Sequence, residues 1–425
     1  RKMIKNIKIG VIGLGYVGLP VSVLFSKKYE VIGFDINKSR VDALNHFNDT
    51  TLEVSNEILQ NTLNSNLTIT SELSDLKSCN FYIITVPTPI LEDKTPDLRP
   101  LEAATKSVGN LLSIDDIIVF ESTVYPGCTE EICVPILEKQ SSLEFNKEFY
   151  CGYSPERVNP GDKEHTIDKI IKVTSGSTEK MALLIDNIYS SVISAGTFKA
   201  SSIRVAEAAK VIENSQRDIN IAFVNELAMI FSKLDIDTTE VLKAASTKWN
   251  FLPFKPGLVG GHCIGVDPYY LASKAIQNGF NPEIILSGRK INDRMGVFIS
   301  ERISEKLISL GKDLSNSSVL VLGVTFKENC PDFRNTKVVD LVKGLKKNSL
   351  KVDIYDPWVS PDLFKKEYSL DVNKELPDKK YDSIILAVSH ESFKNIDLRL
   401  LSKDSKTFIY DIKSFYDKEK TTERL

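Results

Sequence analysis

The sequence predicts an α/β protein built from parallel sheets covered by helices, with a long helical segment between them in the chain. In the first half, short apolar runs alternate with amphipathic stretches. Residues 201 to 252 contain neither glycine nor proline, and the α/β alternation returns in the last third. Such alternation is typical of parallel sheets with helices on both faces.

The first half contains a series of apolar runs that we interpret as buried strands. They are Ile7–Ile12, Glu30–Phe34, Phe81–Val86, Ile117–Glu121 and Ile170–Thr174. Nearly continuous apolar runs are typical of parallel strands that are covered on both faces. Helical patterns lie between many of them, so we expect a parallel sheet.

The centre of the chain is predicted to be helical, because apolar residues such as Val205, Ala209 and Ile212 recur at helical spacing. We expect one long helix, joining two domains, then a shorter helix and a loop rich in glycine and proline at 253–268. The later strand candidates are Ser318–Gly323, Lys351–Tyr355, Ser383–Val388 and Thr407–Tyr410. We expect domains at residues 1–198, 199–312 and 313–425.

Composition excludes several classes of protein. A chain of 425 residues can form two or three domains, and a net charge of −3 provides no basic footprint for nucleic acid or for a membrane surface. No apolar run is long enough to cross a bilayer. The six cysteines are scattered without CxxC pairs or zinc spacing. We therefore expect a cytoplasmic protein with reduced thiols, no resident metal and no signal peptide.

A glycine-rich turn follows the first predicted strand and opens a helix. The turn reads Gly13-Leu14-Gly15-Tyr16-Val17-Gly18. Glycines let the backbone approach a pyrophosphate, and the helix N-terminus supplies free N–H groups. Asp35 ends the second strand, where a carboxylate can accept hydrogen bonds from a ribose diol and would repel a 2′-phosphate. The pattern predicts an NAD site.

Two further strand ends point to the same edge of the sheet. Pro87-Thr88-Pro89 follows one predicted strand, and Glu121-Ser122-Thr123 follows the next. Ligands bind parallel sheets at the carboxyl ends of the strands. Thr88 and Thr123 could therefore contact the cofactor, a ribose or a water molecule, although threonines are also ordinary turn and cap residues.

The stretch Gly260-Gly261-His262-Cys263-Ile264-Gly265-Val266-Asp267-Pro268 suggests covalent chemistry. Cys263 lies in a glycine-rich loop rather than in an apolar run. Asp267, four residues on, would raise the pKa of a neighbouring thiol, so a cation must offset it. Lys210 on the long helix is a candidate, with Asn214 one turn further, but a lysine on a helix is more often simply solvated.

Motifs from end to end resemble those of the UDP-glucose, UDP-N-acetylhexosamine and GDP-mannose 6-dehydrogenases. They are GLGYVGLP at 13–20, PTP at 87–89, EST at 121–123, SPER at 154–157, AExxKxxxN at 206–214, GGHCIGVDP at 260–268 and FKENCPDFRNT at 326–336. The resemblance implies two Rossmann-like domains, one for NAD and one for the UDP part of a UDP-sugar. It also implies a helical centre that forms a homodimer with a shared active site.

The resemblance also implies roles for individual residues. Cys263 is expected to be the nucleophile, with Lys210 and Asn214 stabilising oxyanions. Asp267 is expected to be a base or to position water, Thr123 to anchor water, and Glu156 to be the acid/base for thioester hydrolysis. The remaining cofactor contacts are expected from Gly13, Gly15, Tyr16, Val17, Gly18, Asp35, Arg40, Pro87, Thr88 and, across the dimer, Arg334. Further substrate contacts are expected from Arg157, Val158, Lys248, Phe254, Gly257, Gly260, Gly261, Phe326 and Lys327.

The implied reaction removes four electrons. Hydride leaves C6 for NAD, Cys263 traps the aldehyde as a thiohemiacetal, a second hydride transfer gives a thioester, and water releases the acid. UDP-glucose dehydrogenases carry a second glutamate four residues after the first, where this chain has Pro160. Hydrolysis is therefore expected to depend on Glu156 alone, unless the substrate is bound differently.

The loop around Cys263 indicates the sugar. GGHCIGVDPYYL resembles the branch that acts on UDP-N-acetylglucosamine or its galacto epimer, whereas UDP-glucose and GDP-mannose enzymes tend to carry GGSC and UDP-N-acetylmannosamine enzymes GGPCIAVDP. The expected substrate is UDP-N-acetylglucosamine, oxidised for surface polysaccharide. UDP-N-acetylgalactosamine, UDP-N-acetylmannosamine and UDP-glucose are the alternatives. A two-electron hydroxy-acid dehydrogenase and a non-catalytic NAD-binding protein are alternatives of other classes.

Overall fold

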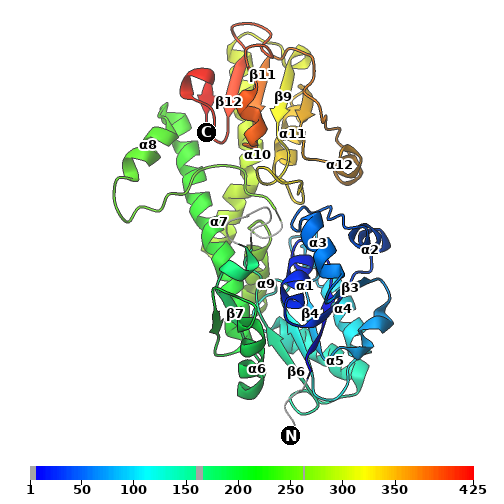
Figure 1. Ribbon diagram of the computed structural model, residues 1–425. Helices are drawn as coiled ribbons and strands as arrows, with labels where there is room; N and C mark the ends of the chain where they lie inside the picture. Colours follow the sequence, from blue (N-terminus) through cyan, green and yellow to red (C-terminus); the bar gives the residue numbers. More distant parts are fainter. Residues whose placement is uncertain (1–5, 159–165, 262–263) are drawn as a thin grey trace. The chain divides into compact units, whose positions relative to one another are not determined.

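The computed structural model describes residues 6–158, 166–261 and 264–425, and it confirms the α/β class (Figure 1). The chain forms two compact units. Unit 1 comprises Arg1–Glu213 and Tyr269–Phe280, and unit 2 comprises Asn214–Pro268 and Asn281–Leu425. No helix in these described ranges is both long and apolar enough to span a bilayer.

Unit 1 contains a parallel sheet of six strands in the order β3-β2-β1-β4-β5-β6. The strands are β1 Lys8–Ile12, β2 Glu30–Phe34, β3 Leu67–Thr70, β4 Phe81–Ile84, β5 Asp116–Phe120 and β6 Phe149–Tyr153. The helices are α1 Gly18–Ser26, α2 Lys38–Asn45, α3 Asn56–Leu63, α4 Arg99–Gly109, α5 Val134–Ser141 and α6 Glu179–Ser190. Strand order reverses between β1 and β4, which is where such sheets bind nucleotides.

Both faces of this sheet are covered. Ile117, Ile118, Val119 and Phe120 follow one another in β5, and all are at most 1 % exposed. Successive side chains of a strand point to opposite faces, so this burial requires packing on both. The prediction of doubly covered parallel strands is confirmed.

One predicted strand of the first half lies elsewhere. The interpretation of Ile170–Thr174 as part of the main sheet was wrong, because β7 (Lys172–Thr174) pairs only with β8 (Thr197–Lys199) in a separate two-stranded sheet. The main sheet is instead completed by β3 and β6, whose sequences, LTIT and FYCGY, lack a long apolar run. Short strands depend on their neighbours more than on their own composition.

The central helices match the predicted order. Helix α7, Ile203–Leu234, is 32 residues long, begins in unit 1 and continues into unit 2. The shorter α8, Thr238–Ala245, follows, and α9, Asp267–Gln277, and α10, Glu283–Ser309, come after the glycine-rich loop. Within unit 2, α7 and α10 are joined by the buried ion pair of Asp218 and Arg289, whose Oδ1 and Nη1 atoms lie 2.6 Å apart.

Unit 2 contains a parallel sheet of five strands in the order β10-β9-β11-β12-β13. Its elements are β9 Ser318–Leu322, α11 Val338–Lys347, β10 Lys351–Tyr355, α12 Pro361–Tyr368, β11 Ser383–Leu386, β12 Phe408–Asp411 and β13 Glu423–Arg424. Val319 and Val321 belong to one apolar core, and Leu320 and Leu322 belong to another. This sheet is therefore also covered on both faces.

Candidate active site

The glycine-rich turn after β1 has the geometry that a pyrophosphate requires. Gly13 has a φ of 95° and donates its N–H to the Phe34 carbonyl at 2.8 Å. A Cβ on Gly18 would lie 1.7 Å from the Gly13 oxygen, so only glycine fits, whereas Gly15 is exposed with no atom within 4 Å of the corresponding position. Gly13 and Gly18 are therefore packed against neighbouring atoms, whereas the backbone at Gly15, just before α1, is accessible to a ligand.

Asp35 lies beside this turn, at the end of β2. Its carboxylate accepts the N–H of Leu14 at 2.9 Å and that of Asn37 at 2.8 Å, and the residue is partly exposed. The carboxylate oxygens have lone pairs left for a ribose diol. Arg40 braces the same turn, because its Nε donates to the Leu14 carbonyl at 2.9 Å while Nη2 pairs with buried Asp49 at 2.8 Å. These residues fit NAD, with Tyr16 and Val17 in the turn itself.

The loops after β4 and β5 are joined by threonine and serine hydroxyls. Thr88 donates its hydroxyl to the Thr123 carbonyl at 2.7 Å, and Ser122 donates to the Val86 carbonyl at 2.6 Å. The Thr88 hydrogen is therefore used within the protein, while Pro87 is exposed and Thr123 partly exposed. The structure brings Pro87, Thr88 and Thr123 together, as predicted.

Glu156 lies in a buried network in unit 1. Its Oε1 accepts the backbone N–H groups of Arg157 and Val158, each at 2.7 Å. Its Oε2 lies 3.0 Å from Nζ of Lys172. The Arg157 guanidinium is directed to Glu213, with Nη2 and Oε1 2.9 Å apart. Arg157 and Val158 therefore hold Glu156 through their backbone, and Pro160 lies outside the described residues.

Two predicted catalytic residues of unit 2 are in direct contact. Asn214 donates its amide Nδ2 to Oδ2 of Asp267 at 2.5 Å, and Asp267 is 1 % exposed as the first residue of α9. Lys210, one turn before Asn214 on α7, is also buried. Cys263 and His262 lie outside the described residues, so the predicted nucleophile stays a prediction.

The loop before Cys263 is fixed by a residue that the sequence analysis missed. Asn225 on α7 accepts the Gly257 N–H at 2.8 Å and donates to the Gly257 carbonyl at 3.0 Å. A side-chain amide that pairs with both groups of one backbone residue sets the position of the loop. Asn225 also donates to Asn292 on α10 at 2.8 Å. Nothing in the local sequence marks Asn225, because its partners are distant in the chain.

The glycines of the GGHC motif meet the segment after β9. A Cβ on Gly260 would lie 2.5 Å from the Asn335 carbonyl oxygen, and one on Gly261 would lie 2.6 Å from the Phe326 ring. Gly261 has a φ of 85° and donates its N–H to that same Asn335 oxygen at 3.2 Å. The predicted substrate residues Gly261 and Phe326 are therefore in contact, and Gly260 packs against the backbone of the same segment.

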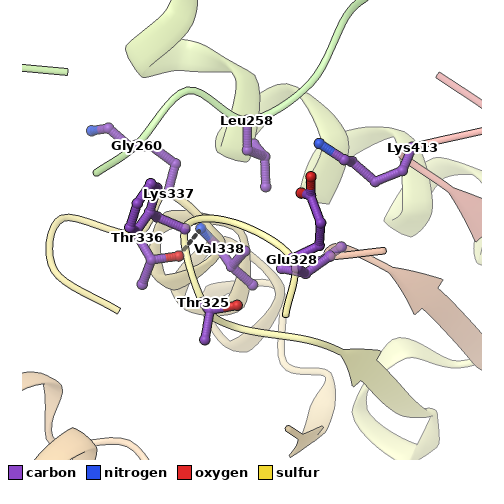
Figure 2. Close-up of a pocket in the computed structure, with 11 residues that line it drawn as sticks. Leu258, Gly260, Thr325, Glu328, Thr336, Lys337, Val338 and Lys413 are labelled. Carbon is purple, nitrogen blue, oxygen red and sulfur yellow. Dashed lines mark hydrogen bonds between the residues drawn. The ribbon is translucent and has the colours of Figure 1, made fainter. Parts of the chain in front are cut away.

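A small polar pocket opens at this junction in unit 2 (Figure 2). Its lining includes Gly260 and Phe326, which were predicted, and Thr325, Glu328, Thr336, Lys337 and Lys413, which were not. Lys413 comes two residues after β12, so the rule that ligands bind at strand ends could have identified it. The described residues contain no group of three His, Cys, Asp or Glu side chains that could hold a metal.

Four predicted contact residues lie in or near the loops of unit 2. Lys327 is partly buried beside the pocket residue Phe326, and Arg334 is paired through Nη2 to Asp332 at 2.6 Å. Lys248 is exposed after α8, and Phe254 is partly exposed in the loop that follows. Their ligand roles remain predictions.

Comparison with known proteins agrees with this geometry. Residues 7–193, 204–294 and 320–418 match the NAD binding, central and UDP binding domains of the UDP-glucose/GDP-mannose dehydrogenase family. The chain is 56 % identical over 99 % of both chains to UDP-N-acetyl-D-glucosamine 6-dehydrogenase of Salmonella typhi. It is 54 % identical over 99 % of this chain and 100 % of the other to the protein of that name from Pseudomonas aeruginosa.

A solved structure shows the same fold. The UDP-D-ManNAc dehydrogenase from Pyrococcus horikoshii matches with a TM-score of 0.88, 29 % identity and 98 % coverage of both chains. The family expected from the motifs is thereby confirmed, as are the NAD cofactor and the parallel Rossmann-type sheets. This chain belongs to the UDP-glucose/GDP-mannose dehydrogenase family.

Proposed function

We propose that the chain is a UDP-N-acetylglucosamine 6-dehydrogenase, which oxidises the C6 alcohol to a carboxylate for surface polysaccharide synthesis. The observation that carries this proposal is the 56 % identity along the whole chain to a relative of that name. Identity to the UDP-D-ManNAc dehydrogenase is only 29 %, over 98 % of both chains. Bound NAD would supply the hydride acceptor for both oxidations, held by Gly13, Gly15, Gly18 and Asp35.

The covalent step is assigned to Cys263. Its thiol adds to the C6 aldehyde to form a thiohemiacetal, which keeps the reactive aldehyde from escaping. The adduct and the later hydrolytic intermediate each carry an oxyanion. We assign Lys210 and Asn214 to stabilise it, and one such donor contributes about 3–4 kcal/mol to lowering the barrier.

Asp267 is assigned to orient the catalytic amide. Because its carboxylate accepts from Asn214 at 2.5 Å, it fixes the direction of that side chain. It would also disfavour a thiolate nearby, and the Lys210 cation offsets this charge. Glu156 and Thr123 are assigned to the water molecule that hydrolyses the thioester.

We further propose that the UDP part binds in the unit 2 pocket and that two copies form a homodimer. Lys413 and Phe326 line the pocket, and the Lys413 ammonium can pair with a diphosphate. Lys337 also lines the pocket, but its Nζ is held by Asp293 at 2.9 Å and by Asp340 at 3.1 Å. Lys327 follows Phe326 in the chain and is assigned to the same ligand. Phe223 and Ile230 on α7 are 55 % and 46 % exposed, and their separation of seven residues places them on one face of the helix, which a second copy would cover. Lys248 and Arg334 are assigned to reach the partner's site.

A panel of UDP-sugars with NAD tests the proposed function. UDP-N-acetylglucosamine should be the best substrate, and two NADH should form per sugar because a carboxylate lies two hydride transfers from an alcohol. Cys263→Ser should stop four-electron turnover, while the control Cys79→Ala, at a buried thiol in unit 1, should keep it. One NADH per substrate would favour a two-electron dehydrogenase, and the absence of NADH formation with every UDP-sugar tested would favour a non-catalytic NAD-binding protein.

A further inference from the structure

Lys172 is a buried charged residue that lies outside the motifs of the family. It opens β7 and is only 3 % exposed. Its Nζ lies 2.7 Å from Oε2 of Glu121 and 3.0 Å from Oε2 of Glu156. Lysine is almost never fully buried unless it is paired, so these two carboxylates explain why it is there.

The network around Lys172 leaves every carboxylate oxygen with a donor. Tyr189 on α6 donates its hydroxyl to Oε1 of Glu121 at 2.5 Å. Oε1 of Glu156 accepts the two backbone N–H groups of Arg157 and Val158. The Arg157 guanidinium is committed to Glu213 and to the Ile171 carbonyl. Lys172 therefore supplies a positive charge in direct contact with Glu156.

The two carboxylates of this network differ in their surroundings. Burial by itself would raise the pKa of Glu156. The Lys172 ammonium and the backbone N–H groups of Val158 and Arg157 have the larger combined effect, so the pKa of Glu156 is below its usual value. For Glu121, burial raises the pKa, and the Lys172 charge offsets this only in part. Glu156 is thus the carboxylate that stays ionised, and Glu121 is the one that takes up a proton first.

We propose that Lys172 is a positioning residue for thioester hydrolysis, whose ammonium holds the Glu156 carboxylate in one orientation and in its ionised form. This inference rests on the proposed function of Glu156. Water attacks the thioester carbonyl and forms a C–O bond, and its proton passes to Glu156. The C–S bond then breaks, the Cys263 thiolate leaves and takes up a proton from water, and Glu156 gives its proton back to water, which leaves the free acid and restores both groups.

The test compares Lys172→Met and Lys172→Gln, which remove the charge, with Lys172→Arg, which retains it. The neutral variants should lower kcat about 10-fold or more, since general-base catalysis contributes at least that much. The acyl-enzyme should accumulate and be visible as a mass adduct on the intact protein, and the KM for the UDP-sugar should fall together with kcat, because hydrolysis of the thioester then limits turnover. The acidic limb of the kcat–pH profile should move up by about one unit or more, because Glu156 loses its cation. Lys172→Arg should keep the limb at its wild-type position.

Two further variants separate this role from ordinary packing. Lys199→Met removes a lysine from the neighbouring strand β8, where Lys199 pairs with exposed Glu179, and should match the wild type. Glu121→Gln disturbs the same network without removing the cation, so its acidic limb should not move up. If Lys172→Met and Lys172→Gln lose rate without moving the limb, or if Glu121→Gln moves it equally, the role of Lys172 is structural and the proposal fails.

A titration of the Glu156 carboxyl distinguishes this inference from the proposed function. The ¹³C signal of Glu156, identified by its loss in Glu156→Gln, should titrate at higher pH in Lys172→Met than in the wild type. If it does, but the wild type forms no acyl-enzyme with any UDP-sugar, the control of Glu156 by Lys172 stands and the proposed chemistry fails. If the titration is unchanged, the inference fails whatever the enzyme oxidises.

Discussion

Asp35 and Asp356 occupy equivalent positions in the two parallel sheets. Asp35 directly follows β2, which pairs with β1, and Asp356 directly follows β10, which pairs with β9. Each accepts a backbone N–H from the turn after the first strand, from Leu14 at 2.9 Å and from Val324 at 2.7 Å. Asp35 is partly exposed, whereas Asp356 is fully buried and lies 3.0 Å from Nε2 of His390. The same residue type is therefore accessible to a ligand in unit 1 and supports the loop in unit 2.

We expect Asp35→Asn to weaken NAD binding about 10-fold to 100-fold, because a charged acceptor for the ribose diol is replaced by a neutral amide. The KM for the UDP-sugar should change little. Titration of the protein with NAD, followed by calorimetry, measures the effect. Asp42→Asn, at an exposed position on α2, is the matched control. Equal NAD affinity in the two variants would contradict the assignment of Asp35.

At the scale of elements, the loop that precedes Cys263 is positioned from two directions within unit 2. Asn225 of α7 holds Gly257, and the Asn335–Lys337 backbone meets Gly260. Asn225 lies on the same helix as the AExxKxxxN motif, eleven residues after Asn214, and Asn335 belongs to the FKENCPDFRNT motif after β9.

We expect Gly260→Ala to lower the affinity for UDP about 10-fold and to destabilise the protein by about 1–3 kcal/mol, because its Cβ would overlap backbone atoms that cannot rotate away. The Asn335 oxygen and the Lys337 nitrogen lie 2.5 and 3.0 Å from that position. Calorimetric titration with UDP and thermal unfolding measure both effects.

Gly288→Ala on α10 is the matched control for this substitution. Its Cβ would have ordinary contacts of 3.5–3.6 Å with Ile219 and Ala222. Alanine favours a helix over glycine, so thermal stability should be equal or higher. A Gly260→Ala protein that binds UDP like the wild type would show that the loop is not held against the segment after β9.

For the whole molecule, stability depends on pH through buried carboxylates that act in opposite directions. In unit 1, burial raises the pKa of Asp116 to about 6. In unit 2, burial by itself would raise the pKa of Asp382. Lys312, the Ser318 N–H and Lys403 have the larger combined effect, so the pKa of Asp382 is below its usual value. An unfolded aspartate titrates near pH 3.9, roughly between the two.

The sign of the pH dependence follows for each. Folded Asp116 retains its proton between about pH 4 and 6, so folding loses stability as pH rises through that window. Asp116→Asn cannot ionise, and at pH 7 it should be more stable than the wild type by up to about 3 kcal/mol, with no difference below about pH 4.

Asp382→Asn should behave in the opposite way. The stability that ionised Asp382 contributes is present above about pH 4 and is lost as pH falls through its lower, folded-state pKa. The variant should therefore be less stable than the wild type at pH 7, and the difference should shrink in acid. Scanning calorimetry from pH 3 to 8 compares the three proteins. Melting curves that shift in parallel with pH would contradict both assignments.

Much of the fold and part of the site could be predicted. The strands Glu30–Phe34 and Lys351–Tyr355 were placed residue for residue, and the long helix was recognised from its period. The strands β3 and β6 were missed, because LTIT is interrupted by two threonines and FYCGY contains a glycine and no β-branched residue. Asn214 and Asp267 were both predicted to be catalytic residues, but the hydrogen bond between them was not predicted.

The sequence by itself determined the glycine turn, the position of Asp35, the alternation of strands and helices, and the motifs of the family. These features are local, since they depend on backbone conformation and on the period of apolar residues within a short window. Only the tertiary structure decided that Lys172 lies between Glu121 and Glu156, and that Asn225 holds Gly257. Such contacts join residues far apart in the chain, and the spacing of residue types does not encode which side chains meet once the sheets and helices have packed.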